Sequence, residues 1–251
     1  MKKKLRKVNA AILIIGNEIL SGRTEDKNVS FIAKWLNDKA GISVDEIHII
    51  PDISSKIIKT VKILSKKYNY VFTTGGIGPT HDDITAKSIS RAFNKKYEHH
   101  KEAYKILEKY YGKNKFNDGR KKMSKMPRSS SLIYNPSSAA PGFKIKNVFC
   151  LPGVPSILQS MMYNCLTYLI KGKKTFSTSI NLSTVESNIA KELEKIQKQF
   201  QNSIQIGSYP FFKLGKVGVS VVLRSKNKHK IALCKKLITT KIIKVKKIKV
   251  I

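Results

Sequence analysis

The sequence predicts an α/β protein in which a doubly wound, mostly parallel sheet is followed by a second, smaller α+β domain. Over the first part of the chain, short apolar runs typical of buried strands alternate with amphipathic segments of helical spacing. After the basic linker KGKKT, residues 171–175, this alternation stops and two predicted strands follow one another directly. We therefore expect one domain at 1–172 and a second at 173–251.

The first domain opens with three strand–helix units. Its first strands are expected at 8–15, 44–50 and 70–73. The first of them is a nearly continuous apolar run, which is typical of a parallel strand covered on both faces. The helix after the first strand has one apolar face and ends before Gly41. The helix after the second strand is expected to have Asp52 or Ser54 as its N-cap.

The remaining elements follow the same patterns. In the first domain we expect a helix at 103–111, a polar and basic stretch up to 131, a strand at 148–151 and a helix at 154–169 with Pro155 in its first turn. In the second domain we expect strands at 176–182, 204–209 and 216–224 and helices at 185–200 and 230–237. Consecutive strand–helix units imply right-handed crossovers and a parallel sheet in the first domain.

Composition excludes several classes of protein. Apolar residues make up 41% of the 251 residues, enough to bury a core, and no apolar run approaches the ~20 residues of a membrane span. Cys150, Cys165 and Cys234 are odd in number and widely spaced, which excludes a disulfide framework and a zinc site built on paired cysteines. We therefore expect a cytoplasmic protein with no membrane partner.

Charge is the most unusual feature of the composition. The chain has 49 Lys and Arg residues against 16 Asp and Glu, a net charge of +33. The excess is mostly lysine and is spread over the whole chain, as an AT-rich genome would produce; the alternative is a role in binding polyanions. No acidic residue follows Glu194, whereas fifteen Lys or Arg residues do. If the protein binds nucleic acid, we expect this basic C-terminal part to make the contact.

The densest group of chemically informative residues is TTGGIGPTHDDIT at 73–85. A strand ends here and a helix begins near Ile84, and the glycines between them free the backbone to approach a ligand. Amides at a helix start suit phosphate or another anion, although such a sequence also makes a merely tight turn. Asp82 and Asp83 repel anions, so together they favour one carboxylate that caps the helix and another that holds a divalent cation.

Three further clusters lie in predicted loops. GNEILSG at 16–22 follows the first strand and precedes Asp26, while NPSSAAPGF spans 135–143 and LPGVPS spans 151–156. Ligands of open parallel sheets bind beyond the carboxyl ends of the strands, where GNEILSG and the main loop both lie. Each cluster also has a purely structural interpretation: Glu18 as a surface residue, Asp26 as a helix N-cap and the other loops as rigid turns.

The candidate ligand-binding residues come from these four clusters. They are Gly16, Asn17, Glu18, Gly22, Asn28, Thr74, Gly75, Gly76, Gly78, Pro79, Thr80, His81, Ser137, Pro141, Gly142, Pro152, Gly153 and Pro155. Among them, His81 either contacts a phosphate or forms hydrogen bonds within its own loop.

The order and spacing of the four clusters, over about 150 residues, resemble the molybdopterin-binding-like (MoaB/Mog) domain in the form that begins proteins of the CinA (competence/damage-inducible) family. The segment after Thr175 is similar to the small KH-like middle domain of CinA proteins. GKVG at 215–218 mimics the loop of a KH domain, but it joins two predicted strands instead of two helices. The amidohydrolase domain of many CinA proteins, which deamidates nicotinamide mononucleotide, has no room here, so we expect that activity to be absent.

The resemblance implies a metal-dependent pyrophosphatase that hydrolyses ADP-ribose-like or FAD-like dinucleotides. It implies that Asp26, Asp82 and Asp83 are the catalytic and metal-binding residues and that the loop at 75–80 cradles the phosphates. The implied cofactor is a divalent metal, Mg²⁺ or Co²⁺, with K⁺ as a further candidate ion. Molybdopterin is a less favoured ligand.

Two departures from the family pattern bear on activity. Ile157 stands where family members often have an acid, and Ser138 and Ala139 stand where they often have Gly-Thr. These changes argue more strongly against pyrophosphatase activity than against binding of the ligand. The alternatives are a module that binds molybdopterin or a nucleotide without turnover, and a basic nucleic-acid-binding protein. The expected partners are a small nucleotide substrate, further copies of the chain in a dimer or trimer, and nucleic acid at the C-terminal part.

Overall fold

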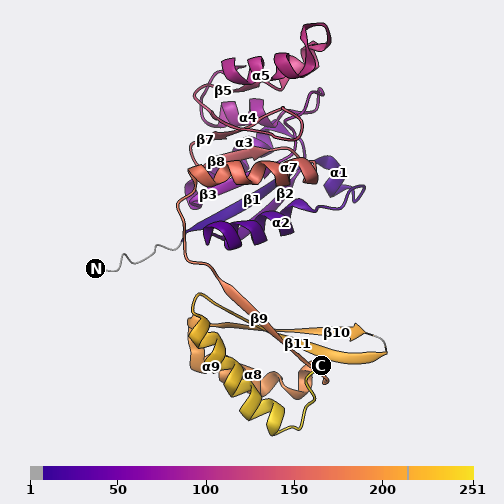
Figure 1. The fold of residues 1–251 in the computed structure, drawn as a ribbon, viewed down its shortest axis with the longest axis vertical. Helices are drawn as coiled ribbons and strands as arrows, with labels where there is room; N and C mark the ends of the chain where they lie inside the picture. Colours follow the sequence, from indigo (N-terminus) through magenta and orange to yellow (C-terminus); the bar gives the residue numbers. More distant parts are fainter. Residues whose placement is uncertain (1–7, 214) are drawn as a thin grey trace, which may run out of the picture. The chain divides into compact units, whose positions relative to one another are not determined.

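The chain forms two compact units, and the boundary between them falls between Gly172 and Lys173. The structure, a computed structural model, describes residues 8–213 and 215–251 (Figure 1). Among these residues, no helix combines the length and the apolar character needed to cross a membrane.

A six-stranded sheet forms the centre of the first unit. Its strands are β1 (Asn9–Ile15), β2 (Ser43–Ile50), β3 (Tyr70–Thr74), β6 (Ser131–Ile133), β7 (Gly142–Ile145) and β8 (Val148–Leu151). In the order β2-β1-β3-β8-β7-β6, the first four strands are parallel and the last two are antiparallel additions at one edge. The predicted mostly parallel sheet is confirmed, whereas the short strands β6 and β7 carry no periodic signal and are not predicted.

Helices cover both faces of this sheet (Figure 1). The helices that pack on it are α2 (Asn28–Trp35), α3 (Ser54–Lys67), α4 (Thr85–Ala92) and α7 (Pro155–Met161). Successive residues of β1 point to opposite faces, so that Leu13 and Ile15 pack with α3 and α4. Ile12 and Ile14 pack with α2 and α7 on the other side. The doubly wound architecture follows from strands that are apolar on both faces.

Further elements precede and follow these helices. They are α1 (Asn17–Leu20), β4 (Tyr97–His99), α5 (Lys101–Tyr111), α6 (Asp118–Lys122) and β5 (Lys125–Pro127). The strands β4 and β5 pair antiparallel. The stretch that the sequence analysis treats only as polar and basic therefore contains both α6 and β5.

The start of α3 differs from the prediction. The helix begins at Ser54, its N-cap residue is Ile53, and no side chain caps it. The carboxylate of Asp52 instead accepts a hydrogen bond from the amide of Asn17 (2.9 Å). Asp52 therefore links the loop after β2 to the start of α1.

One of two helix ends lies where the sequence predicts it, and the other does not. The segment after α2 continues as a wider turn, Leu36–Ala40, and ends at Gly41 in the left-handed conformation (φ 65), as its position predicts. The helix expected at 154–169 is α-helical only to Met161 and continues as 3₁₀ turns over Met162–Tyr168.

The second unit is a three-stranded antiparallel sheet with two helices on one face (Figure 1). Its elements are β9 (Phe176–Leu182), α8 (Ala190–Phe200), β10 (Gln205–Lys213), β11 (Lys216–Ser225) and α9 (Lys228–Ile238). The strand order is β10-β11-β9, and Val219, Val221 and Leu223 of β11 pack with apolar residues of both helices. The predicted smaller α+β domain is confirmed.

Two boundaries in this unit are corrected. The helix predicted at 185–200 is a 3₁₀ turn, Glu186–Asn188, followed by α8. The strand predicted at 204–209 extends to Lys213 because β10 pairs with β11 along its whole length. In GKVG at 215–218, Gly215 lies between β10 and β11 and the other three residues begin β11. The segment thus joins two strands, as expected, and not two helices.

Candidate functional site

The loops that follow β1, β3 and β8 meet at one edge of the first sheet. The amide of Gly75, after β3, donates to the carbonyl of Leu151 at the end of β8 (3.1 Å). The amide of Gly16, after β1, donates to the carbonyl of Ile50 at the end of β2 (3.2 Å). Because parallel strands end at the same edge, clusters that are far apart in the sequence become neighbours.

Two glycines are required by the path of the loop after β3. Gly75 has φ +97, and a Cβ there would overlap the main-chain carbonyl oxygen of Ile15. Gly76 has φ +66, and a Cβ there would overlap the hydroxyl of Thr85. The amide of Thr85 also donates to the carbonyl of Gly76 (3.0 Å). The loop therefore passes closer to its neighbours than a residue with a side chain allows.

The next amides of this loop are available to a ligand. Within residues 8–213 and 215–251, the amides of Gly76, Ile77 and Gly78 donate no hydrogen bond to another residue. The buried hydroxyl of Thr85, which lies against Gly76, also has no hydrogen-bond partner there. Unpaired main-chain donors next to the start of a helix suit an anionic group.

Asp83 holds this loop in shape and does not cap α4. Its Oδ2 accepts hydrogen bonds from the amide (2.8 Å) and the hydroxyl (2.5 Å) of Thr80, while α4 has no side-chain cap. Asp82 is exposed, and the hydroxyl of Thr80 holds the pKa of Asp82 below its usual value. The charges of His81 and Lys122 lower that pKa further. Asp82 is therefore ionised at neutral pH.

Asp26 occupies the position of a helix cap. Its carboxylate accepts hydrogen bonds from the amides of Asn28 (3.3 Å) and Val29 (2.9 Å) in the first turn of α2. The side chain of Asn28 is buried and donates to the carbonyl of Gly153 (2.7 Å), which joins the loop after β1 to the loop after β8. Gly153 in turn packs against Gly75. The structural interpretation of Asp26 accounts for both of its carboxylate oxygens.

The predicted metal-binding set needs a correction. In the part of the chain that the structure describes, no group of three or more His, Cys, Asp or Glu side chains is placed to hold a metal ion. Asp26, Asp82 and Asp83 are thus not assembled as a preformed three-carboxylate centre. The reason is that α2 engages Asp26 and Thr80 engages Asp83.

Asp52 is a carboxylate at this edge that the sequence analysis assigns to a helix cap. Burial raises the pKa of Asp52, the hydrogen bond from Asn17 opposes this shift, and the charges of Glu18, Asp82 and Asp83 raise the pKa further. The contact joins two separate loops, so no spacing in the sequence could reveal it. The edge thus carries more negative charge than the predicted residues alone provide.

We expect Asp52→Asn to stabilise the protein at pH 7 and to have no effect at pH 3. Folding raises the pKa of Asp52 above its ordinary value of 3.8. The protein therefore loses free energy of unfolding as the pH rises through the folded pKa, and it loses none at a pH below 3.8. Asn keeps an acceptor for the amide of Asn17. Thermal unfolding at both pH values measures the difference, and a lower melting temperature of the variant at pH 7 would contradict the expectation.

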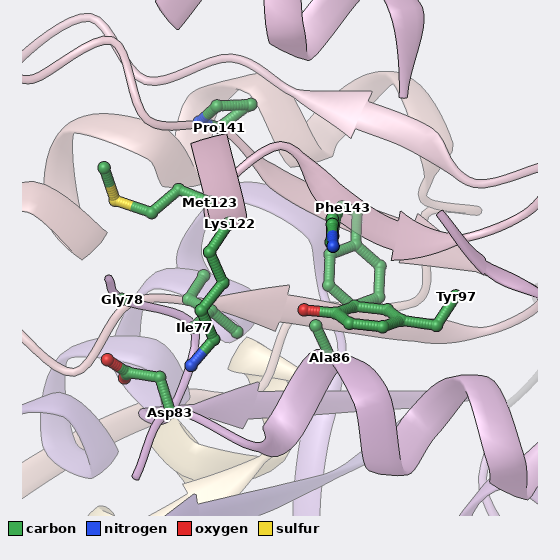
Figure 2. A pocket seen from close by; sticks show the side chains of 10 residues that line it. Ile77, Gly78, Asp83, Ala86, Tyr97, Lys122, Met123, Pro141 and Phe143 are labelled. Atoms are coloured by element: carbon green, nitrogen blue, oxygen red, sulfur yellow. The ribbon is translucent and has the colours of Figure 1, made fainter. Parts of the chain in front are cut away.

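A further wall of the site comes from α4, β4, α6 and β5. A cleft of about 240 Å³ beside the loop is lined by His81, Asp83, Ile84, Lys87, Tyr97, Lys122 and Lys125. The ammonium of Lys122 donates to the carbonyl of Thr80, and Gly119 of α6 packs close to Pro79. Figure 2 shows Lys122 extending from α6 toward the loop and the hydroxyl of Tyr97 pointing into the neighbouring pocket. The sequence analysis misses these lysines because nothing in their spacing separates them from the general lysine excess.

The NPSSAAPGF loop is fixed mainly by Asn135. The side chain of Asn135 accepts a hydrogen bond from the amide of Ser137 (2.9 Å) and donates to the carbonyl of Ala140 (2.9 Å). The hydroxyl of Ser137 is hydrogen-bonded to that of Ser160 in α7 (2.8 Å). Pro141 then lines the pocket that also contains Gly78 and Asp83 (Figure 2). This loop reaches the site through Pro141.

Other predicted residues have structural roles. Gly142 lies in β7, where a Cβ would overlap the carbonyl oxygen of Cys150. Gly22 has φ +72 and open space around it. Ala139 adopts φ +61, and Ile157 packs partly buried against the core on the α2 and α7 side. Thus both departures from the family pattern lie outside the loop after β3.

The remaining predicted residues lie at the ends of β1, β3 and β8, in the loops that follow these strands, in α1 or at the first residue of α2 or α7. They are Gly16, Asn17, Glu18, Asn28, Thr74, Gly75, Gly76, Gly78, Pro79, Thr80, His81, Pro152, Gly153 and Pro155.

Comparison with known proteins supports the assignment of both units. The sequence matches the family described as "Probable molybdopterin binding domain" over residues 11–172 and the family described as "FAD synthase, middle domain" over residues 174–249. A protein of Archaeoglobus fulgidus is 36% identical over 222 residues, which cover 88% of this chain and 93% of that protein. A "Probable FAD synthase" of Caenorhabditis elegans is 31% identical over 229 residues, covering 81% of this chain and 44% of that protein.

A CinA-like relative and a solved structure agree with these matches. The "CinA-like protein" of Sulfurihydrogenibium sp. is 37% identical over 179 residues, covering 68% of this chain and 44% of that protein. This chain thus spans less than half of the CinA-like protein and of the Caenorhabditis protein. The crystal structure of CinA from Thermoplasma acidophilum, titled as having unknown function, superimposes with a TM-score of 0.60 at 30% identity, covering 64% of this chain and 98% of that chain. The chain belongs to the molybdopterin-binding-like (MoaB/Mog) domain family, as a CinA-like member.

Proposed function

We propose that the first unit is a metal-dependent pyrophosphatase that hydrolyses ADP-ribose-like or FAD-like dinucleotides. The observation that carries the proposal is the loop after β3, where the unpaired amides of Gly76, Ile77 and Gly78 are followed by Asp82 and Asp83 and the carboxylate of Asp83 lies against Gly78. Such a loop suits a phosphate group that is accompanied by a cation. The name "Probable FAD synthase" of the Caenorhabditis relative supports a nucleotide ligand.

The carboxylates fit a divalent cation that binds together with the substrate. Mg²⁺ usually keeps several waters and is held by one or two carboxylates plus substrate phosphates, so a preformed three-residue centre is not required. Asp82 is exposed and ionised, and Thr80 binds only one of the two carboxylate oxygens of Asp83. We assign these two residues to the cation, Mg²⁺ or Co²⁺, and assign Asp26 to the helix cap. When bound, the cation neutralises phosphoryl charge and lowers the pKa of a bound water.

The protein's own groups complete the chemistry. Hydrolysis breaks one P–O bond of the pyrophosphate, joins the oxygen of water to phosphorus, and divides ADP-ribose into AMP and ribose 5-phosphate. The loop amides hold the phosphate oxygens, and Lys122 and Lys125 stabilise the negative charge that develops on the leaving phosphate. We also assign to Asp82 the role of accepting a proton from the attacking water.

Incubating the protein with ADP-ribose or FAD and either Mg²⁺ or Co²⁺ tests this proposal. We expect AMP to be released, as measured by chromatography of the nucleotides, and EDTA to stop the release. If wild-type protein releases no more AMP than the Asp83→Asn variant under every metal condition, the proposal fails.

The second candidate is a module that binds a nucleotide or molybdopterin without turnover. It is favoured by the missing preformed carboxylate centre among the described residues and by Ile157, Ser138 and Ala139 at positions where the family pattern differs. Isothermal titration with ADP-ribose distinguishes the two candidates. Saturable binding with no product at any metal concentration would favour the binding module.

We also propose that the protein works in a reducing cytoplasm as a dimer or trimer. All three cysteines are free and buried, and burial raises the pKa of the thiols of Cys150 and Cys165 to about 12. Such thiols are poorly suited to forming disulfides, which supports a reducing compartment. Light scattering on the purified chain measures the oligomeric state.

A further inference from the structure

The sheet of the second unit has one face that no helix of that unit covers (Figure 1). Among the residues whose side chains the structure describes, strand alternation and the register assign eleven to this face: Ser177, Ser179, Asn181, Gln205, Gly207, Tyr209, Phe211, Gly218, Ser220, Val222 and Arg224. The residues between them, such as Val219 and Val221, form the core with α8 and α9. The uncovered face thus combines small polar side chains, two aromatic rings and one arginine.

Glycines next to the two aromatic residues bring the rings against the sheet. Phe211 stands opposite Gly218 in the register, and its ring occupies the space that a Cβ at Gly218 would take. The ring of Tyr209 lies in the same way against Gly207. Tyr209 nevertheless remains 50% exposed. The rings therefore lie along the sheet and still present surface to solvent.

The charge of this unit is strongly positive, and its few acids lie on the helical side. Residues 173–251 contain eighteen Lys and Arg and three acids. Glu192 pairs with Lys246 (3.2 Å), Glu194 pairs with Lys198 (2.5 Å), and Glu186 accepts a hydrogen bond from Ser208. No acidic residue belongs to the uncovered face as the register defines it. A polyanion can therefore approach this face without meeting a carboxylate on it.

We propose that the uncovered face of β9, β10 and β11 binds single-stranded nucleic acid, with unpaired bases stacked on Tyr209 and Phe211. Every base has a flat face that stacks on an aromatic ring, and this stacking needs bases that are free of a complementary strand. Arg224 and the surrounding lysines attract the phosphates, while Ser, Asn and Gln side chains on the face can bond to base edges. The face has too little apolar surface, Val222 and the two rings, for a stable protein interface.

Fluorescence anisotropy with the full chain tests the proposal. The probe is a fluorescein-labelled strand of roughly 12 nucleotides of alternating A and C, prepared as RNA and as DNA. We expect Tyr209→Leu and Phe211→Leu each to weaken binding about tenfold and to leave the salt dependence of the affinity unchanged, because no charge is removed. Phe212→Leu is the matched control: Phe212 is 74% exposed but belongs to the opposite face, so binding should be unchanged.

Two further measurements test whether the aromatic rings themselves contact the strand. Phe211→Tyr keeps a ring and should bind as the wild type does, which separates stacking from damage to the fold. Ultraviolet crosslinking of the wild-type chain to the strand should label the peptide that contains 205–213. The proposal is overturned if both leucine variants bind like wild type, or if heparin and a duplex of equal length displace the probe as well as an unlabelled single strand does. Preference for RNA or for DNA would identify which strand the face accepts, and either is compatible with stacking.

Discussion

Asp83→Asn is expected to release AMP from ADP-ribose about 100-fold more slowly than the wild type. The change removes one negative charge from the pair of carboxylates that we assign to the cation. It keeps an oxygen that can accept the hydrogen bonds from the amide and hydroxyl of Thr80. The loop should therefore retain its shape while its ability to hold a cation falls. Initial rates at saturating Mg²⁺ and the Mg²⁺ dependence of the rate measure both effects.

Asp118→Asn is the control for this experiment. Asp118 is an exposed carboxylate on α6 that pairs with Lys121 (3.2 Å), so the control makes the same chemical change outside the loop. We expect it to keep the wild-type rate. Equal rates for Asp83→Asn and wild type, with equal thermal stability, would overturn the pyrophosphatase proposal and leave the carboxylate of Asp83 only its role in the shape of the loop.

Gly75→Ala is expected to lower the free energy of unfolding by about 3 kcal/mol. The left-handed backbone at Gly75 strains any residue with a Cβ, and that Cβ would also overlap the carbonyl oxygen of Ile15. The ends of β3 and β8 cannot separate to relieve the overlap without breaking the hydrogen bond between Gly75 and Leu151. Urea unfolding followed by circular dichroism measures the loss.

Gly112→Ala separates the two contributions. Gly112 also has a positive φ, +75 with ψ 149, but nothing lies within 4 Å of the place where its Cβ would stand. We expect a loss of about 1 kcal/mol there, from backbone strain alone. If the two alanine variants lose the same stability, the close approach of Gly75 to Ile15 is not a constraint on the fold.

The central sheet could be predicted because its residues are buried on both faces. In β1, β3 and β8 nearly every residue must be apolar, which leaves a clear run in the sequence. Strands β6 and β7 are three and four residues long and leave no comparable run. Strand β10 is longer than predicted because its outer end pairs with β11 through residues such as Pro210 and Phe212, which show no simple alternation.

The loop after β3 could be predicted from its glycines, but its surroundings could not. Lys122 and Tyr97 reach the site from segments of little periodicity, and only the packing of α6 on the loop places them there. Of the two carboxylates that spacing offers as helix caps, Asp26 binds the start of its helix and Asp52 does not. Asp52, which looks like a helix cap, contacts Asn17 in another loop, whereas Asp26 binds the first turn of α2. Local spacing shows which residues can form a cap but not which of them do.

In the proposed site, a phosphate would contact the peptide groups of Gly76, Ile77 and Gly78, whereas the cleft beside them is lined by side chains from other segments. Point mutation can exchange a lysine or a tyrosine of a wall, but it cannot delete a peptide N–H except by introducing proline. Binding of the phosphate group can therefore be retained while substitutions change which phosphate-containing ligand is preferred. This arrangement would let the same fold evolve to bind different nucleotides through substitutions in α6 and β5, while the glycines stay unchanged.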